Sequence, residues 1–376
     1  MKQIRNLLKL IIAAILLAGM FAACEGPMGP RGYQGEPGDP GPGSVVNWEG
    51  YKEGIVCASC HNPDYDTTYF VWARKYQWAL SKHSFGGDYE RNAAPCSGCH
   101  TTEGFIQLYM GRTLTSQVNA SPPGCFACHS PHSRADFSLR TTDPVSVMSA
   151  VEGVPDLVFD YGKANLCVSC HKTRELSPMP DPTKTASTDT IVIKSSRWYP
   201  HYGVQGQMLA GTGGFEFEGV TYDNSFHTGS DVIKQQGCPI CHMAEPNAGT
   251  GFGGGHTMLI AYPGTHGEDQ ELLTGCNLTG CHSGNLTSLD YKEGQTITEE
   301  LLDSLQTILL NKGWIDEESG LVIASNSNPL KIAPAYLAGA LFNYFFVEHD
   351  MSLGVHNTYY THKLLESSID ALNEEE

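Results

Sequence analysis

The chain has 376 residues, of which 23 are lysine or arginine and 41 are aspartate or glutamate, so its formal net charge is −18. This acidity argues against nucleic acid as a partner, because nucleic acids attract basic surfaces. It favours basic protein partners or simple solubility. The chain also contains 13 cysteines and 15 histidines, and their spacing carries most of the information.

The first 23 residues have the layout of an export signal. Three basic residues precede an apolar run at positions 10–18, and Ala22 and Ala23 lead into Cys24. A membrane-spanning helix is the alternative, but the run is too short and lacks a charged stop on its far side. The arrangement around Cys24 resembles the lipobox of bacterial lipoproteins, in which the cysteine becomes the acylated N-terminus. We therefore predict a signal peptide over residues 1–23 and a lipid anchor at Cys24.

Residues 24–43 form a biased segment with glycine at every third position from Gly26 to Gly41 and several prolines between. This is the collagen period. A triple helix would make the protein a trimer. The alternative, which we favour, is a single extended spacer of ~18 residues that reaches ~55 Å at about 3.1 Å per residue.

A short motif of two cysteines followed by a histidine occurs six times between residues 57 and 282. The copies are Cys57-Ala-Ser-Cys60-His61, Cys96-Ser-Gly-Cys99-His100, Cys125-Phe-Ala-Cys128-His129, Cys167-Val-Ser-Cys170-His171, Cys238-Pro-Ile-Cys241-His242 and the wider Cys276-Asn-Leu-Thr-Gly-Cys281-His282. C-x-x-C-H is the attachment site of a c-type haem. Each thiol bonds one vinyl-derived carbon of the porphyrin edge, and the histidine holds the iron from below.

Two other uses of paired cysteines explain the motifs less well. A structural zinc site needs four ligands and does not require a histidine directly after every second cysteine. Disulfides suit an exported chain, but they give no reason for six histidines in register. Twelve of the 13 cysteines lie in the motifs, and the remaining one is Cys24. The sequence thus predicts six covalently bound haem c groups.

Residues 44–294 are predicted to form the haem-binding region. Gly and Pro interrupt almost every apolar run there, so side chains alone could not build a large core and porphyrins would supply much of the apolar interior. We expect a multihaem cytochrome c fold with mainly short α-helices and irregular loops wrapped around haems, little sheet and a C-terminal helical segment.

Nine histidines do not follow a cysteine, which exceeds the six remaining iron faces. Six of them lie in segments that resemble those carrying distal haem ligands in multihaem cytochromes c. These six are His83, His132, His201, His227, His256 and His356. His129 and His132 are three residues apart, so His132 could hardly reach the opposite face of the haem that His129 holds. We expect His132 to ligate a different haem, while the pairing of the other histidines stays open.

From about residue 51 to 373 the chain resembles the bacterial multihaem cytochromes c that move electrons across or beyond the outer membrane, and among these the hexahaem surface type. The segments that carry this resemblance are Pro200-His-Tyr-Gly-Val-Gln-Gly-Gln-Met-Leu, Cys238-Pro-Ile-Cys-His-Met, Gly254-Gly-His-Thr and Gly354-Val-His-Asn-Thr-Tyr-Tyr-Thr-His-Lys-Leu-Leu. The resemblance implies that the six distal histidines complete bis-histidine irons. It leaves His266, His349 and His362 as residues that are not ligands.

Residues 295–376 differ from the preceding region in their regular apolar periodicity, and we predict that they form a helical cap that supplies His356. Plain core packing would also explain this periodicity. The expected helices run from Thr298 to Lys312, from Pro334 to Val347 and from Asn357 to Leu372, on the basis of apolar periodicity. Thr298 is the expected N-cap of the first helix, with Glu299 and Glu300 in its first turn.

These observations favour an electron carrier over an enzyme. If two histidines saturate every iron, no face is open to substrate, and without a methionine ligand the reduction potentials stay low. The alternatives are a reductase of nitrite, hydroxylamine or a sulfur oxyanion with one open iron, and a subunit of a polymeric cytochrome filament. The resemblance also implies redox proteins or extracellular acceptors as partners and, with the lipid anchor, a place on the outer membrane, at the cell surface more than at the periplasmic face.

Overall fold

The computed structural model describes residues 58–85, 89–134, 136–245, 252–264 and 268–374. The predicted signal, Cys24, the Gly-x-y segment, Cys57 and His266 lie outside the described residues. All the elements below belong to residues 48–376, which form one compact unit.

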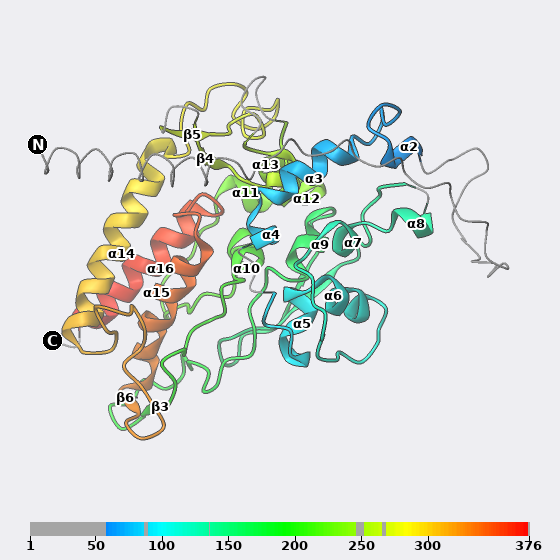
Figure 1. Cartoon of the computed structure of the whole chain (residues 1–376). Coiled ribbons are helices and arrows are strands. Elements are labelled where there is room, and N and C mark those ends of the chain that lie inside the picture. Colours follow the sequence, from blue (N-terminus) through cyan, green and yellow to red (C-terminus); the bar gives the residue numbers. More distant parts are fainter. Residues whose placement is uncertain (1–57, 86–88, 135, 246–251, 265–267, 375–376) are drawn as a thin grey trace, which may run out of the picture. The chain divides into compact units, whose positions relative to one another are not determined.

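Short helices joined by irregular connections make up most of the region that contains the motifs (Figure 1). They are α2 (Ala58–His61), α3 (Val71–Ala79), α4 (Lys82–Phe85), α5 (Ala94–His100), α6 (Thr102–Tyr109), α7 (Cys125–Cys128), α8 (Pro131–Arg134), α9 (Ala164–Val168), α10 (Gln205–Ala210), α11 (Phe226–Gly229), α12 (Asp231–Gln236), α13 (Cys238–His242) and the 3-10 turns η1 (Gly255–Thr257) and η2 (Tyr291–Glu293). The expected fold class, with short helices, irregular loops and little sheet, is confirmed.

The described strands are three residues long and form three antiparallel pairs. β1 (Val145–Val147) pairs with β2 (Leu157–Phe159), β3 (Ile191–Ile193) with β6 (Leu330–Ile332), and β4 (Ala261–Pro263) with β5 (Asp269–Glu271). The β3–β6 pair joins the motif region to the C-terminal region, with Ile191 opposite Ile332.

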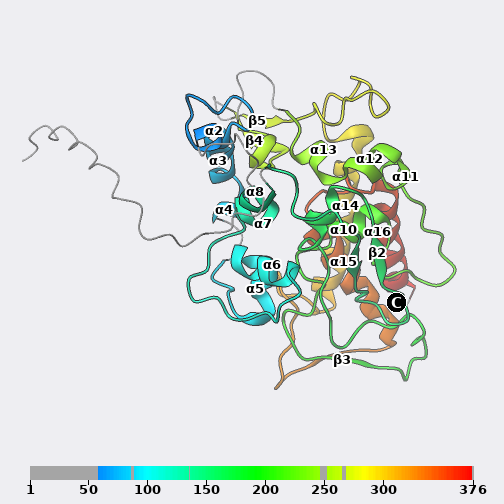
Figure 2. The ribbon, with the colours of Figure 1, turned by 90° about the vertical axis from the view of Figure 1, so that its right-hand side faces the viewer.

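Three longer helices lie side by side at the C-terminal end of the chain (Figures 1 and 2). They are α14 (Gly294–Asn311), α15 (Ala338–Asp350), which follows the 3-10 turn η3 (Ala335–Leu337), and α16 (Thr358–Asn373). All three predicted helices are therefore present. Among the described residues, no helix combines the length and the apolar character that a membrane crossing requires.

The predicted N-cap of the first of these helices is wrong. Thr298 lies inside α14, fully buried, and its hydroxyl donates to the carbonyl of Gly294, four residues earlier, at 2.8 Å. The helix begins at Gly294 because the Asp290 carboxylate accepts hydrogen bonds from the amides of Gln295 (2.9 Å) and Thr296 (3.2 Å). A carboxylate that satisfies amides of the first turn acts as a cap, so Glu299 and Glu300 fall in the second turn.

The main hydrophobic core joins this bundle to the segment around residues 150–217. Trp198 and Phe215 from that segment and Phe342, Phe346 and Leu305 from the bundle are among its largest buried side chains. The predicted haem-binding region and helical cap thus share one core.

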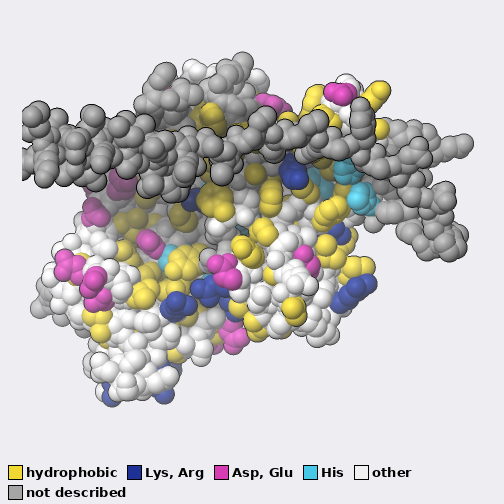
Figure 3. All heavy atoms as spheres, viewed as in Figure 1, with side chains coloured by type: hydrophobic (Ala, Val, Ile, Leu, Met, Phe, Trp, Pro, Cys, Tyr) yellow, Lys and Arg dark blue, Asp and Glu magenta, His cyan; other side chains and the backbone are white. Residues whose placement is uncertain are grey.

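Fewer apolar side chains are buried near the first motifs. One small cluster there contains Phe105, Ala127 and Leu166, whereas several large apolar side chains between residues 65 and 89 are exposed, among them Phe70, Trp72 and Phe85. Figure 3 shows hydrophobic side chains spread over the visible face of the molecule.

Candidate haem sites

A helical turn places the cysteines and the histidine of a motif together. In α9 and the turn that follows it, Cys167, Cys170 and His171 stand at positions i, i+3 and i+4, which share one face of a helix. The amide of His171 donates to the carbonyl of Cys167 at 2.9 Å, and the amide of His129 donates to the carbonyl of Cys125 at 2.8 Å. The spacing of the motif and the pitch of the helix thus present two thiols and an imidazole to the same side.

The sixth motif reaches a similar closure without a helix. Residues 276–282 form turns, and the amide of His282 donates to the carbonyl of Cys276 at 3.1 Å. The two additional residues are accommodated between the cysteines, where Gly280 has a φ of +87°, a conformation that glycine adopts easily. The first thiol and the histidine therefore stay close despite the wider spacing.

Each motif histidine lies opposite one of the six predicted distal histidines. The distances between ring centroids are 6.2 Å for His61–His132, 6.1 Å for His100–His201, 6.2 Å for His129–His256, 6.1 Å for His171–His83, 6.2 Å for His242–His356 and 6.2 Å for His282–His227. We name these pairs sites 1 to 6, in the order of their motifs.

The pairs join segments that are distant in sequence. His132 lies opposite His61 of the first motif and not opposite its neighbour His129, as the three-residue spacing predicts. His129 instead faces His256 of η1. Two adjacent short helices, α7 and α8, thus contribute to two different sites.

Hydrogen bonds at Nδ1 orient several of these rings. The Nδ1 atoms of His129, His227 and His242 lie 3.3, 2.9 and 3.1 Å from the carbonyl oxygens of Ser138, Val355 and Met258. A protonated Nδ1 that donates to an acceptor leaves Nε2 as the nitrogen available to a metal, which is how metal-binding histidines are commonly held.

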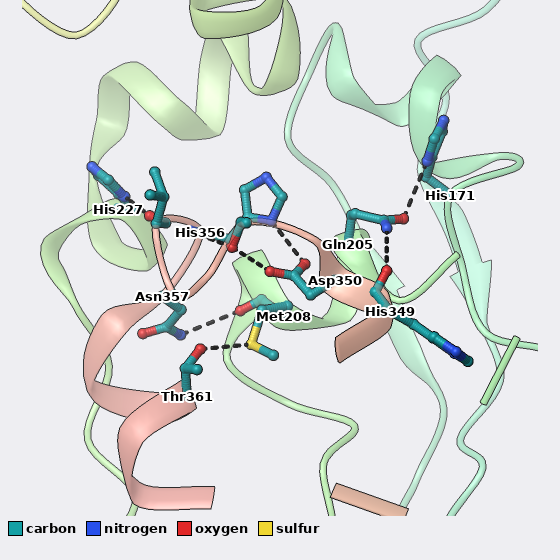
Figure 4. A network of polar contacts seen from close by, with 12 residues as sticks. His171, Gln205, Met208, His227, His349, Asp350, His356, Asn357 and Thr361 are labelled. Atoms are coloured by element: carbon teal, nitrogen blue, oxygen red, sulfur yellow. Dashed lines mark hydrogen bonds and ion pairs between the residues drawn. The ribbon is translucent and has the colours of Figure 1, made fainter. Parts of the chain in front are cut away.

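Two further rings use side chains as acceptors. Nδ1 of His171 is 3.1 Å from Oε1 of Gln205, and Nδ1 of His356 is 2.8 Å from Oδ1 of Asp350 (Figure 4). The amide group of Gln205 also donates to the backbone carbonyl of His349 at 2.9 Å. The segment at the C-terminal end of α15 therefore supports the rings of both site 4 and site 5.

Burial disfavours the charged form of several of these imidazoles. Burial, with smaller effects of nearby charges, lowers the pKa of His83, His201, His242 and His256 to about 4. The neutral imidazole is the form that binds a metal. His356 differs, because the lowering by burial is outweighed by the Asp350 carboxylate, so its pKa is raised above the usual value.

The two described histidines that were not predicted as ligands have other partners. Nδ1 of His349 is 3.1 Å from the carbonyl of Pro200, and its Nε2 is 3.0 Å from the Glu348 carboxylate. Nε2 of His362 lies 3.1 Å from the carbonyl of Gly294. Both rings thus contribute to packing and hydrogen bonding around the bundle.

Thiols of different motifs lie next to each other. Three pairs of thiols are within hydrogen-bonding reach of each other: Cys99 and Cys170, Cys167 and Cys238, and Cys241 and Cys276. The motif cysteines of site 4 therefore lie beside those of sites 2 and 5. The motif cysteines of site 5 also lie beside those of site 6.

Site 3 also adjoins site 4. Cys128 and Cys170 pack against the same small apolar cluster. Burial, with the nearby thiol of Cys167, raises the pKa of the Cys128 thiol to about 12. Motif 4 therefore has three neighbouring motifs.

Two glycines allow the backbones of neighbouring motifs to approach. Gly237 precedes Cys238, and a Cβ there would lie 2.2 Å from the Cβ of Ala164 in α9. Gly275 precedes Cys276, and a Cβ there would lie 2.1 Å from the carbonyl oxygen of Ile240. No other residue type fits at either position without displacing a neighbouring motif.

The geometry gives no support to the zinc and disulfide alternatives within the part of the chain that the structure describes. The ten cysteines of motifs two to six are free thiols there. In the same residues, no three or more of His, Cys, Asp and Glu gather as a metal-binding group. The recurring arrangement is instead a pair of opposed imidazoles beside two thiols.

Sequence reasoning did not identify Gln205 and Asp350 as part of the sites. Gln205 stands in the segment Pro200–Leu209 that carries the resemblance, but it is 34 residues from His171 in sequence. Asp350 lies six residues before His356, and a carboxylate so close to a candidate ligand was the signal available for it.

No family model matches the chain. It is 23% identical over 372 residues to the C-type polyheme cytochrome OmcB of Geobacter sulfurreducens, a match that covers 86% of this chain and 44% of that protein. It is 24% identical over 311 residues to the C-type polyheme cytochrome OmcC of the same organism, covering 73% of this chain and 36% of that protein. The chain thus spans less than half the length of these curated relatives.

Among solved structures, the chain is similar to one titled "Crystal Structure of Outer Cell Wall Cytochrome OcwA". The TM-score is 0.48 and the sequence identity is 20%, and the match covers 80% of this chain and 50% of that chain.

Proposed function

We propose that the chain is a multihaem c-type cytochrome that transfers electrons through six covalently attached, bis-histidine haems. The observation that carries the proposal is the set of six ring pairs, each of which joins one motif histidine to one other histidine. Similarity to two polyheme c-type cytochromes over most of the chain supports the same class.

The spacing of the rings fits an iron between them. With a metal–nitrogen bond of about 2 Å on each side and about 1 Å from each nitrogen to its ring centre, two axial imidazoles have centroids about 6 Å apart. The six observed distances are 6.1–6.2 Å. The paired histidines would hold the axial positions, and the motif cysteines would hold the porphyrin edges. When bound, each haem iron supplies a centre that gains and loses one electron.

The same arrangement favours a carrier over a reductase. An iron with two protein imidazoles has no position open to a substrate, and all six motif histidines have a partner ring. The ligand sets contain no methionine, which would raise the reduction potential. The exposed aromatic side chains of α3 and α4, such as Trp72 and Phe85, offer apolar surface that a porphyrin could cover.

The contacts between motifs support a branched order of sites. Site 4 adjoins sites 2, 3 and 5, site 5 adjoins site 6, and site 1 is linked to site 3 because His132 follows motif 3 in sequence. Attachment positions in van der Waals contact would hold neighbouring porphyrin edges close together. Electron transfer needs such closeness, so the fold itself would define the route.

Intact mass and a visible spectrum of the purified, exported protein test the proposal. We expect a mass that exceeds the polypeptide and its lipid by six haems, and a low-spin spectrum that carbon monoxide does not change after reduction. A colourless protein, or one without added mass, would refute the proposal. Stoichiometric binding of carbon monoxide would instead favour the reductase.

We also propose that the protein is exported and anchored to the outer membrane by an acyl group on Cys24, with redox proteins or extracellular acceptors as partners. The export layout of residues 1–23 and the cysteine left over from the motifs support this. Metabolic labelling with a fatty acid should label the protein, and replacing Cys24 with alanine should abolish the label. An unlabelled natural protein would contradict the anchor.

A further inference from the structure

Asp350, the last residue of α15, presents its carboxylate to His356 in the loop between α15 and α16. Met351, Leu353 and Gly354 in this loop have φ values of 59°, 49° and 86°. Non-glycine residues rarely adopt positive φ, and such backbone persists where the surrounding structure demands it. The loop is therefore held in one conformation, which fixes Asp350 relative to His356.

Asp350 is almost completely buried, with 3% of its surface exposed. Its Oδ1 accepts a hydrogen bond from Nδ1 of His356 at 2.8 Å, and its Oδ2 accepts one from the hydroxyl of Ser352. Both oxygens thus have donors. In Figure 4 His356 and Asp350 lie between His227 on one side and His171 on the other.

This acceptor differs in charge from those of the other sites. The Nδ1 atoms of His129, His227 and His242 contact backbone carbonyl oxygens, and that of His171 contacts the side-chain amide oxygen of Gln205. Only the partner of His356 is an anion in this set. A carboxylate that accepts the Nδ1 proton makes the imidazole a stronger electron donor to its metal, and charged hydrogen bonds are roughly twice as strong as neutral ones.

We propose that Asp350 is a positioning residue that gives site 5, formed by His242 and His356, the lowest reduction potential of the six sites. The inference rests on the proposed function. Stronger donation from His356 and the buried negative charge both stabilise ferric iron over ferrous iron. The reaction affected is the addition of one electron, from an external reductant, to the ferric iron. No bond breaks, and the proton stays between Nδ1 and Oδ1.

The position of site 5 gives this tuning a consequence. The thiol contacts Cys167–Cys238 and Cys241–Cys276 place site 5 between sites 4 and 6. An electron that moves from site 4 to site 6 must pass through site 5. A low reduction potential at site 5 opposes this passage and so separates site 6 from sites 1 to 4.

Potentiometric titration of the haem-loaded protein, followed by its visible spectrum, tests the proposal. Asp350→Asn keeps the shape and an oxygen acceptor but removes the charge. We expect the lowest of the six one-electron steps to rise, with at least a tenfold change in the equilibrium constant, which corresponds to 59 mV for one electron. The other five steps should keep their order.

Two further variants control the result. Ser352→Ala removes the donor to Oδ2 and leaves a more basic carboxylate, so the lowest step should fall. Gln205→Glu places a carboxylate beside His171 and should lower a different step, that of site 4. The opposite signs of Asp350→Asn and Ser352→Ala distinguish tuning from a general loss of structure.

An unchanged potential of the lowest step in Asp350→Asn would overturn the proposal. If Asp350→Asn does not assemble, an unchanged lowest step in Ser352→Ala would overturn it. So would a rise in all six steps together. Each of these results is read on protein that contains six haems, whereas failure of the proposed function would appear as missing haem in the unmodified protein. The two failures are therefore distinguishable.

Discussion

Replacing Gly237 with alanine should destabilise the contact between motifs 4 and 5. Gly237 has a φ of +56°, and a Cβ at this position would lie 2.2 Å from the Cβ of Ala164 and 3.1 Å from the carbonyl oxygen of Tyr161. Overpacking costs about 1–3 kcal/mol, and a left-handed conformation costs an L-residue about 1–2 kcal/mol. The free energy of unfolding should therefore fall by about 2–5 kcal/mol, a large part of the 5–15 kcal/mol that is usual for a folded domain.

Unfolding of the haem-loaded protein in guanidinium chloride, followed by far-ultraviolet circular dichroism, measures this loss. Gly219→Ala is the matched control, because Gly219 has a φ of +81° and no atom within 4 Å of an added Cβ. It should lose only the conformational part, about 1–2 kcal/mol. Equal losses in the two variants would show that the close approach of α9 and α13 does not contribute, and would refute the reasoning.

Two other predictions concern a distal ligand and the bundle. His201→Met should leave six haems attached but raise the potential of one, because a methionine ligand raises it; redox titration measures this, and His266→Met should change no step. Asn343→Leu should lower the free energy of unfolding by about 1–3 kcal/mol, since the buried Asn343 side chain bonds both the amide and the carbonyl of Phe215 at 2.7 and 2.8 Å. Denaturant midpoints measure that loss, and an unchanged midpoint would contradict it.

The motifs can be recognised in the sequence because their geometry is local. Two thiols and an imidazole that would meet one porphyrin must be closely spaced along the chain, and a single helical turn satisfies this spacing. The distal histidines could be chosen only as a set. Which ring faces which depends on contacts between distant segments, such as the approach of η1 to α7 that brings His256 to His129, and no local pattern records it.

The helix boundaries show a similar limit. Apolar periodicity located all three C-terminal helices, but the start of α14 depends on which side chain satisfies its first amides. Thr298 and Asp290 are both acceptable caps by residue type. The structure selects Asp290, because Thr298 is buried against α16, where its hydroxyl lies 3.0 Å from Nε2 of His362. That choice follows from tertiary packing, which overrides local preference.

The division of the chain between a well-packed bundle and loosely packed motif segments has a physical basis in the sites themselves. In the proposed function, covalent bonds to the porphyrin would fix the motif helices with little help from side chains, so segments such as α2 and α3 would need few buried apolar residues. A hydrogen bond that tunes a metal ligand needs a fixed donor–acceptor distance. Asp350, the last residue of α15, and Val355, in the loop that follows it, contact His356 of site 5 and His227 of site 6 and accordingly lie beside the largest hydrophobic core. The packed part of the chain thus supports the contacts that covalent attachment cannot provide.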